Sequence, residues 1–218
     1  MRIAVLGATG AVGSLVVQEA LRQGLLVTAL ARDPRQVPAR PNLTVAEADV
    51  FDAASIARAI NGSEVLISTL GGKNVLKVGA EAVVSSGIDR IVWLGAHGTG
   101  ESAQSAGWFT RSLLSLLMRS ELADKEAADR IVLAAGGTAL HVGPMNSGPA
   151  EQHTLPLESA PRTFFPSTIS RSAVAVALVE EAVQARFPGQ TVVAFSQKGA
   201  ASAPAAGRGA LRAPDRSE

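Results

Sequence analysis

The chain has 218 residues, 47% of them hydrophobic, and its 20 basic and 19 acidic residues leave a net charge of +1. This length suffices for one well-buried domain, and the near-neutral charge gives no bulk attraction to nucleic acid or to an acidic membrane. We therefore expect a small-molecule partner, no nucleic acid and no membrane.

The absence of cysteine excludes disulfides and thiolate metal sites, and the three histidines lack the spacing of a metal site, so no metal is predicted.

Short apolar runs alternate with stretches of helical periodicity along most of the chain. The strands are expected at residues 3–6, 25–31, 43–46, 65–68, 91–94, 138–142 and 191–195. The helices are expected at residues 12–23, 53–60, 75–86, 113–135 and 172–185, and glycines stand where several of them end. This alternation predicts βαβ units and therefore an α/β fold with a doubly wound, Rossmann-type parallel sheet in a single domain.

Two connections are longer than is usual in such a sheet. Residues 95–110 follow the fifth expected strand and residues 143–165 follow the sixth. Long loops at the carboxyl ends of parallel strands commonly build substrate pockets, although a solvated insertion without a role is the alternative. We assign residues 1–198 to the domain, and residues 199–218, rich in glycine, alanine and proline, to a disordered tail.

Signals for export or membrane insertion are not found. The first expected strand begins two residues after Met1, where a secretory signal would need a basic region and a longer apolar segment. The most apolar patch, residues 113–118, is far shorter than the roughly 20 residues of a membrane-spanning helix. These observations predict a cytoplasmic protein, and we expect a monomer or a homodimer.

A glycine-rich turn, GATGAVG at residues 7–13, connects the first strand to the first helix. Glycines at 7, 10 and 13 permit a sharp turn, let a pyrophosphate approach the backbone and let the helix pack close to the strand. The free N–H groups and the positive end of the helix then face the phosphates. An ordinary strand-to-helix turn is the alternative, but the position between a strand and a helix favours a dinucleotide site.

Charged residues follow the second strand, in the order Arg32, Asp33, Pro34 and Arg35. A fold that binds NAD usually offers a carboxylate here, whereas one that binds NADP offers an arginine to the 2′-phosphate. Arg32 comes first, Arg35 can add a second fork of donors, and Asp33 is typical of a turn. The segment favours NADPH over NADH, with a surface turn of incidental charges as the alternative.

Two further segments are suited to a nucleotide. Asp49 could accept a hydrogen bond from the adenine amino group with Val50 beside the ring, whereas Asp52 is expected to cap the helix that follows it. The fourth strand leads into Thr69, Leu70 and Gly71, within a segment whose small residues and backbone groups permit close approach by a cofactor.

These segments resemble the atypical short-chain dehydrogenase/reductase family, in particular its NmrA-like and biliverdin-IXβ and flavin reductase-like NAD(P)-binding members. The resemblance covers about residues 1–198 and rests on GATGAVG at 7–13, ALARDP at 29–34, ADVFD at 48–52, DKEAAD at 124–129, LHVGPM at 140–145 and ISR at 169–171.

The resemblance implies a role for each matching residue. The pyrophosphate would be held by Gly7, Thr9, Gly10, Ala11 and Val12. Arg32 would bind the 2′-phosphate, Asp49 and Val50 the adenine, and Leu70 and Gly71 the adjoining ribose. The nicotinamide would be lined by Gly143, Pro144 and Met145, and Lys125 would contact its ribose.

The sequence departs from the family at the proton donor. Many dehydrogenases of the superfamily use a Tyr-x-x-x-Lys pair, but this chain contains no tyrosine, and Glu121, four residues before Lys125, is typical of a helical salt bridge. Flavin reductase-like relatives carry a serine where this chain has Ala96. The adjacent His97 has a side chain that titrates near neutral pH, so His97 and Lys125 are the catalytic candidates. A solvent-exposed or structural His97 is the alternative.

Aromatic residues at the edges of the two long loops are candidates for contact with a planar substrate. They are Trp108, Phe109, Phe164 and Phe165, with His153 as a polar candidate; packing in the core is the alternative for the aromatic residues. His141 lies inside an apolar strand and is expected to be a core residue.

Together the residues predict an NADPH-dependent reductase that transfers hydride to a flat acceptor of the flavin, quinone or carbonyl type. The alternatives are a non-catalytic NAD(P) sensor and a non-redox isomerase or dehydratase.

Overall fold

The computed structural model describes residues 1–96, 119–149, 153–159 and 168–196. The tail predicted at 199–218 and the helical residues predicted at 113–118 lie outside these ranges.

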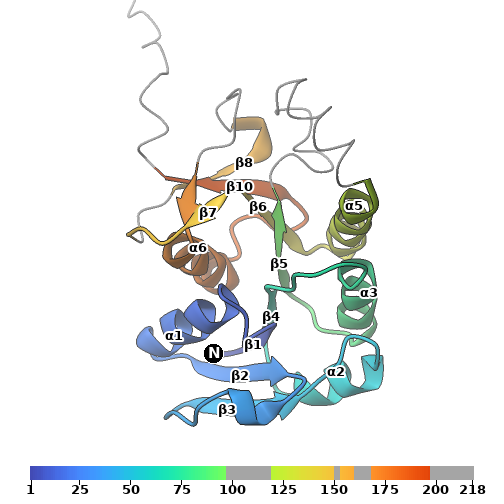
Figure 1. The fold of residues 1–218 in the computed structure, drawn as a ribbon, viewed down its shortest axis with the longest axis vertical. Coiled ribbons are helices and arrows are strands. Elements are labelled where there is room, and N and C mark those ends of the chain that lie inside the picture. The colour runs from blue at the N-terminus through green and yellow to red at the C-terminus, as the bar shows by residue number, and fades with distance from the viewer. Residues whose placement is uncertain (97–118, 150–152, 160–167, 197–218) are drawn as a thin grey trace, which may run out of the picture.

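Eight strands form one central sheet in the order β3-β2-β1-β4-β5-β6-β10-β8, with helices on both of its faces (Figure 1). The strands are β1 (Arg2–Leu6), β2 (Leu26–Ala31), β3 (Leu43–Glu47), β4 (Val65–Ser68), β5 (Ile91–Ala96), β6 (Thr138–Val142), β8 (His153–Pro156) and β10 (Thr191–Phe195). All neighbouring strands are parallel except β10 and β8, which are antiparallel. The predicted Rossmann-type α/β fold is confirmed.

The sheet separates two apolar cores. Two helices pack together on one face, α1 (Gly13–Arg22) and α6 (Arg171–Gln184), and three cover the other, α2 (Ala53–Ala59), α3 (Leu76–Ser85) and α5 (Arg119–Ala134) (Figure 1). Val5, Val16 and Leu178 lie in the first core, and Leu66 and Trp93 in the second. The central strands are almost continuously apolar because both of their faces are buried. In the described part of the chain, no helix combines the length and apolar content needed to cross a bilayer.

The structure contains strands that the sequence did not predict. In the region 143–165, expected to be a loop, β7 (Met145–Asn146) pairs with β9 (Ile169–Ser170), and β8 forms an edge of the main sheet. They were missed because two-residue strands and a half-exposed edge strand lack an apolar run. A second correction concerns β5, which continues to Ala96, so that Gly95 and Ala96 belong to the sheet rather than to the loop expected at 95–110.

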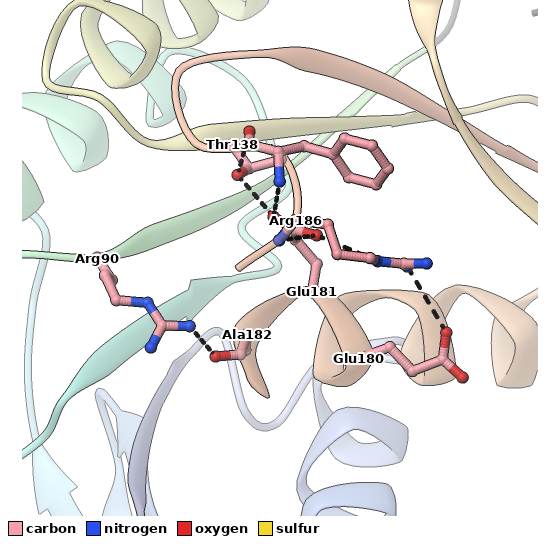
Figure 2. Close-up of polar contacts among 7 residues, drawn as sticks. Arg90, Thr138, Glu180, Glu181, Ala182 and Arg186 are labelled. Carbon is pink, nitrogen blue, oxygen red and sulfur yellow. Dashed lines mark hydrogen bonds and ion pairs between the residues drawn. The ribbon is translucent and has the colours of Figure 1, made fainter. Parts of the chain in front are cut away.

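The buried carboxylate of Glu181 closes the C-terminal end of α6 (Figure 2). One of its oxygens lies 3.1 Å from the Thr138 hydroxyl, and the other accepts the backbone N–H of Arg186 at 3.3 Å. On the same turn of the helix, the Arg90 guanidinium donates to the carbonyl of Ala182. Burial of a carboxylate without partners costs free energy, but here both oxygens of Glu181 have partners. The bond to Thr138 therefore links α6 to the start of β6.

Candidate functional site

A tight turn joins the end of β1 to the start of α1. Gly7 has a φ of 81°, a left-handed conformation that is strained for other residues, and its carbonyl accepts the N–H of Gly10 at 2.9 Å. A Cβ at position 13 would lie 2.1 Å from the same carbonyl oxygen, so α1 begins this close to β1 only because Gly13 has no side chain. At positions 7 and 13 a side chain would therefore strain the backbone or clash with it, which explains why the predicted glycines stand there.

Thr69, just after β4, holds this turn from the neighbouring strand. Its backbone N–H donates to the Leu6 carbonyl at 2.9 Å. Its hydroxyl lies 3.1 Å from the same oxygen and 3.3 Å from the carbonyl oxygen of Gly7. The end of β4 and the glycine turn are thus joined by side-chain as well as backbone hydrogen bonds.

The start of α1 presents unused hydrogen-bond donors. Val12 is the N-cap residue, no side chain caps the helix, and its first turn contains no acidic residue. Within the described ranges, the backbone N–H groups of Ala11 and Val12 have no hydrogen-bond acceptor. Free N–H groups at the positive end of a helix form a site for an anion, and phosphate is a common occupant.

A cleft of about 290 Å³ opens beside the turn, at the carboxyl ends of β1, β2 and β4. Because β2 and β4 pair with opposite edges of β1, the cleft lies where the strand order reverses, the usual ligand position in such sheets. The predicted residues in its lining are Gly7, Thr9, Gly10, Arg32, Asp49, Val50, Thr69, Leu70 and Gly71. The lining also includes residues that the sequence did not single out, namely Leu6, Leu30, Ala31, Ala48, Phe51 and Val75.

Phe51 is the most informative of the residues that sequence reasoning missed. It is 69% exposed although it is a large apolar residue, and it lies on the lining of the cleft. Its N–H donates to Oδ1 of Asp49 at 3.0 Å, and the Asp49 N–H donates to the Ser55 hydroxyl at 2.9 Å. Asp52 caps α2 as predicted, since its carboxylate accepts the N–H of Ser55 at 3.2 Å. These bonds fix the backbone of Phe51 beside the Asp49 carboxylate, and both residues line the cleft.

The charged segment after β2 divides into one cleft residue and one ion pair. Arg32 lines the cleft and forms no ion pair with any residue in the described ranges. Asp33 caps a short 3-10 helix, η1 (Pro34–Gln36), which confirms its predicted turn role. The Arg35 Nε lies 2.8 Å from Oδ1 of Asp33, outside the cleft lining. Hydrogen bonds from the Arg35 side chain lower the pKa of the Asp33 carboxyl, and that carboxylate in turn raises the pKa of Arg35.

Lys125 lies on α5, half-buried and outside the lining of this cleft. The preceding residue, Asp124, accepts the N–H groups of Leu76 at 3.1 Å and Lys77 at 3.0 Å. These bonds supply the cap that α3 otherwise lacks, because its N-cap residue, Val75, makes no side-chain bond. The segment of α5 that carries Lys125 is therefore tied to the start of α3.

A second carboxylate of α5 reaches the sheet. Asp129 Oδ2 lies 3.0 Å from Nε2 of His141 on β6, and both side chains are buried. The prediction of a core role for His141 is confirmed. A Cβ at position 95 would lie 2.4 Å from Cδ2 of His141, so Gly95 of β5 makes room for the imidazole.

The residues expected around the nicotinamide follow β6. The Pro144 carbonyl accepts the N–H of Ile169 at 3.1 Å, Gly143 is half-buried, and Met145 begins β7 and is 37% exposed. They lie two strands beyond β4 in the sheet and are not part of the described cleft lining. Their contact with a cofactor stays a prediction.

The remaining candidates are not brought to the cleft by the described structure. His153 is exposed on β8, the third strand beyond β5, with its ring centroid 6.1 Å from that of Phe195. Outside the described residues lie His97, Trp108, Phe109, Phe164, Phe165 and the side chain of Glu121. The proton-donor and substrate assignments therefore stay predictions.

The cleft suits the adenosine diphosphate half of a nicotinamide dinucleotide. The N–H groups of Ala11 and Val12 at the start of α1, which have no acceptor in the described ranges, suit a pyrophosphate, and Gly7 and Gly10 of the turn line the cleft beside them. The apolar lining around Val50 suits a purine ring, and the guanidinium of Arg32, which has no ion-pair partner among the described residues, suits a phosphate.

Comparison with known proteins supports this assignment. A family model described as NAD(P)H-binding matches residues 7–185, a range that extends from the glycine turn to the end of α6. The NAD(P)-binding family expected from the sequence is confirmed.

Solved structures resemble the chain over most of its length. A protein from Burkholderia pseudomallei, named as a presumed exported protein, is 28% identical with a TM-score of 0.70, and the match covers 89% of this chain and 99% of that one. A wide-type short-chain dehydrogenase/reductase from Veillonella parvula DSM 2008, in complex with NADP, is 17% identical with a TM-score of 0.75 and coverages of 90% and 94%. An anaerobillin reductase from Escherichia coli O157:H7 is 18% identical with a TM-score of 0.72 and coverages of 90% and 98%. At their low identities, the last two show a shared fold.

Proposed function

The chain belongs to the NAD(P)H-binding family, and we propose that it is an NADPH-dependent reductase that transfers hydride to a flat small-molecule acceptor of the flavin, quinone or carbonyl type. The observation that carries the proposal is the position of Arg32 in the cleft while Arg35 neutralises Asp33 outside it. In this kind of fold an arginine here accommodates the 2′-phosphate of NADP, whereas a carboxylate binds the ribose hydroxyl of NAD.

The described residues would divide the adenosine half of the cofactor among them. Gly7, Thr9 and Gly10, with the N–H groups of Ala11 and Val12, would bind the pyrophosphate. The adenine and its ribose would contact other residues of the lining, namely Asp49, Val50, Phe51, Thr69, Leu70 and Gly71.

NADPH, when bound, supplies the hydride, so the protein has to supply orientation and a site that excludes water. By the family resemblance Lys125 would contact the nicotinamide ribose, and the contacts of Asp124 and Asp129 fix α5 on both sides of it. By the family resemblance the nicotinamide would be lined by Gly143, Pro144 and Met145. The acceptor would lie against Trp108, Phe109, His153 and Phe165. His97 is the proposed proton donor, and for a flavin or quinone acceptor the solvent can serve instead.

A second function, a non-catalytic NAD(P) sensor, is favoured by two features of the chain. The sequence contains no tyrosine, and β5 ends in Ala96, which has no hydroxyl to donate. A sensor needs the binding cleft and no proton donor, so cofactor binding alone does not separate the two functions.

The decisive experiment measures binding and turnover separately. NADPH and NADH are titrated into the protein with nicotinamide fluorescence as the signal, and oxidation of NADPH is then followed by absorbance with flavin mononucleotide, a small quinone and a small aldehyde. We expect NADPH to bind at least about tenfold more tightly than NADH, as a charge-assisted phosphate contact predicts, and at least one acceptor to be reduced. Tight binding without turnover of any acceptor would overturn the reductase in favour of the sensor. Equal affinities would overturn the 2′-phosphate assignment.

A further inference from the structure

The Asp33–Arg35 pair lies directly beside the cleft residue Arg32. The Asp33 carboxylate receives three N–H groups from Arg35: the backbone N–H at 3.1 Å, Nε at 2.8 Å and Nη2 at 3.1 Å. The two side-chain bonds engage both carboxylate oxygens, which is the fork arrangement in which a guanidinium binds a carboxylate with the best-defined geometry. Because Asp33 is also the N-cap of η1, the pair is built into the turn that follows β2.

Arg35 is poorly placed to bind the cofactor itself. Its side chain is 90% exposed, it is not among the residues that line the cleft, and its fork is occupied by Asp33. Arg32, in contrast, lines the cleft without an ion pair in the described part of the chain. The two arginines after β2 therefore occupy different environments.

Without Arg35, the carboxylate of Asp33 would be uncompensated one residue from the guanidinium that is proposed to bind a phosphate. A carboxylate near the end of this strand favours the ribose hydroxyls of NAD and opposes the 2′-phosphate of NADP. The Asp33 side chain is 32% exposed, so water screens the repulsion, and we expect it to change affinity only about three- to tenfold.

We infer that Arg35 sets the preference for NADPH indirectly: it neutralises Asp33, so that Arg32 alone meets the 2′-phosphate. This inference rests on the proposed NADPH site and gives Arg35 a role other than the phosphate contact expected from the sequence. Arg35 is thus a positioning and charge-compensating residue, and Asp33 is the group through which it acts. The lowered pKa of the Asp33 carboxyl agrees with a charge that the pair stabilises.

The test compares Arg35→Ala, Asp33→Asn and the double variant, with the ratio of the NADH to the NADPH dissociation constant as the readout. Asparagine preserves the N-cap, so these variants keep the turn. We expect Arg35→Ala to lower the ratio about three- to tenfold, and Asp33→Asn together with Arg35→Ala to restore it to within about twofold of the wild type. If Arg35 bound the phosphate directly, the double variant would lose as much as Arg35→Ala, and the inference would be wrong.

The matched control is Arg22→Ala on α1. Arg22, whose side chain is exposed, makes an equally bidentate pair with the Glu19 carboxylate, with Nε at 2.8 Å and Nη2 at 2.7 Å, away from the cleft. Its removal changes the net charge by the same amount and should leave the ratio unchanged; an equal fall would attribute the effect to overall charge and overturn the inference. If the NADH to NADPH dissociation-constant ratio of the wild type is near one, the NADPH proposal itself is wrong. If that ratio is high but the double variant does not restore it, only the role of Arg35 is wrong.

Discussion

His141 and Asp129 form a buried pair in which Nε2 and Oδ2 are 3.0 Å apart and the side chains are only 1% and 7% exposed. The pair joins β6 to α5, and Gly95 of the neighbouring strand leaves space for the imidazole. Since Asp129 lies one helical turn after Lys125, this contact also fixes the part of α5 that is proposed to face the nicotinamide ribose.

Replacing Asp129 by alanine should destabilise the fold substantially. The change leaves a buried imidazole without its carboxylate partner, and such losses cost about 2–4 kcal/mol. Urea denaturation followed by circular dichroism measures the free energy of unfolding. Arg22→Ala, which breaks a pair whose arginine side chain is 70% exposed, is the control and should lower the free energy of unfolding much less than Asp129→Ala. A loss of less than about 0.5 kcal/mol in Asp129→Ala would show that the pair contributes little.

Gly95→Ala tests the same contact from the opposite side. The added methyl group would lie 2.4 Å from Cδ2 of His141, so the ring or the strand has to move, at a cost of about 1–3 kcal/mol. Gly71→Ala is the comparison, because a Cβ there meets no atom within 4 Å. If the two variants have equal stability, the space around His141 is not restrictive.

Thr69→Val should loosen the glycine turn. Valine has nearly the same shape as threonine but cannot donate to the carbonyl oxygens of Leu6 and Gly7, so we expect a loss of about 1 kcal/mol in the free energy of unfolding. Because the same turn binds the pyrophosphate in our proposal, NADPH and NADH should weaken together. Thr69→Ser retains the hydroxyl and should keep most of the affinity; equal losses in both variants would point to the methyl group instead.

Arg32→Ala should separate the two cofactors. Loss of a charge-assisted contact to the 2′-phosphate predicts an affinity for NADPH lower by about 10- to 100-fold, with NADH changed less than about threefold. Isothermal titration calorimetry with both cofactors measures the difference. Parallel losses would mean that Arg32 shapes the cleft without contacting the phosphate.

Phe51→Ala should weaken NADPH and NADH by the same factor. The ring is exposed in the cleft and can cover the adenine, so we expect about three- to tenfold weaker binding of both cofactors and no measurable change in stability. Nicotinamide mononucleotide, which lacks adenine, should bind as before. Val183→Ala on α6, another exposed apolar residue, is the control. A preserved affinity in Phe51→Ala would exclude a role for the ring in binding.

The parts predicted correctly from the sequence depend on local rules. The turn at residues 7–13 was found because the left-handed φ of Gly7 and the close approach of Gly13 to the Gly7 carbonyl are local features that leave a glycine pattern. Asp52 was found as a cap because its bond to Ser55 spans three residues. The apolar runs of the central strands similarly follow from burial on both faces.

The parts that were missed depend on partners distant in the sequence or on a choice between rotamers. β7 has two residues, and its existence depends on pairing with β9, more than twenty positions away. Nothing in the sequence shows whether Arg35 turns toward the cofactor or back to Asp33. Phe51 was overlooked because a single exposed aromatic residue produces no periodic pattern in the sequence. Only its position beside Asp49 in the cleft lining makes it a candidate for contact with the cofactor.

The carboxylate of Asp124 has a consequence for the motions of the molecule. Because it caps α3 from within α5, the first turn of α3 opens only when α5 releases it. Hydrogen exchange should therefore report the two helices as a single cooperative opening unit. That unit includes Lys125, and it adjoins the cleft lining at Val75. Local unfolding of the proposed adenosine site and of the proposed nicotinamide site therefore requires the same free energy of opening.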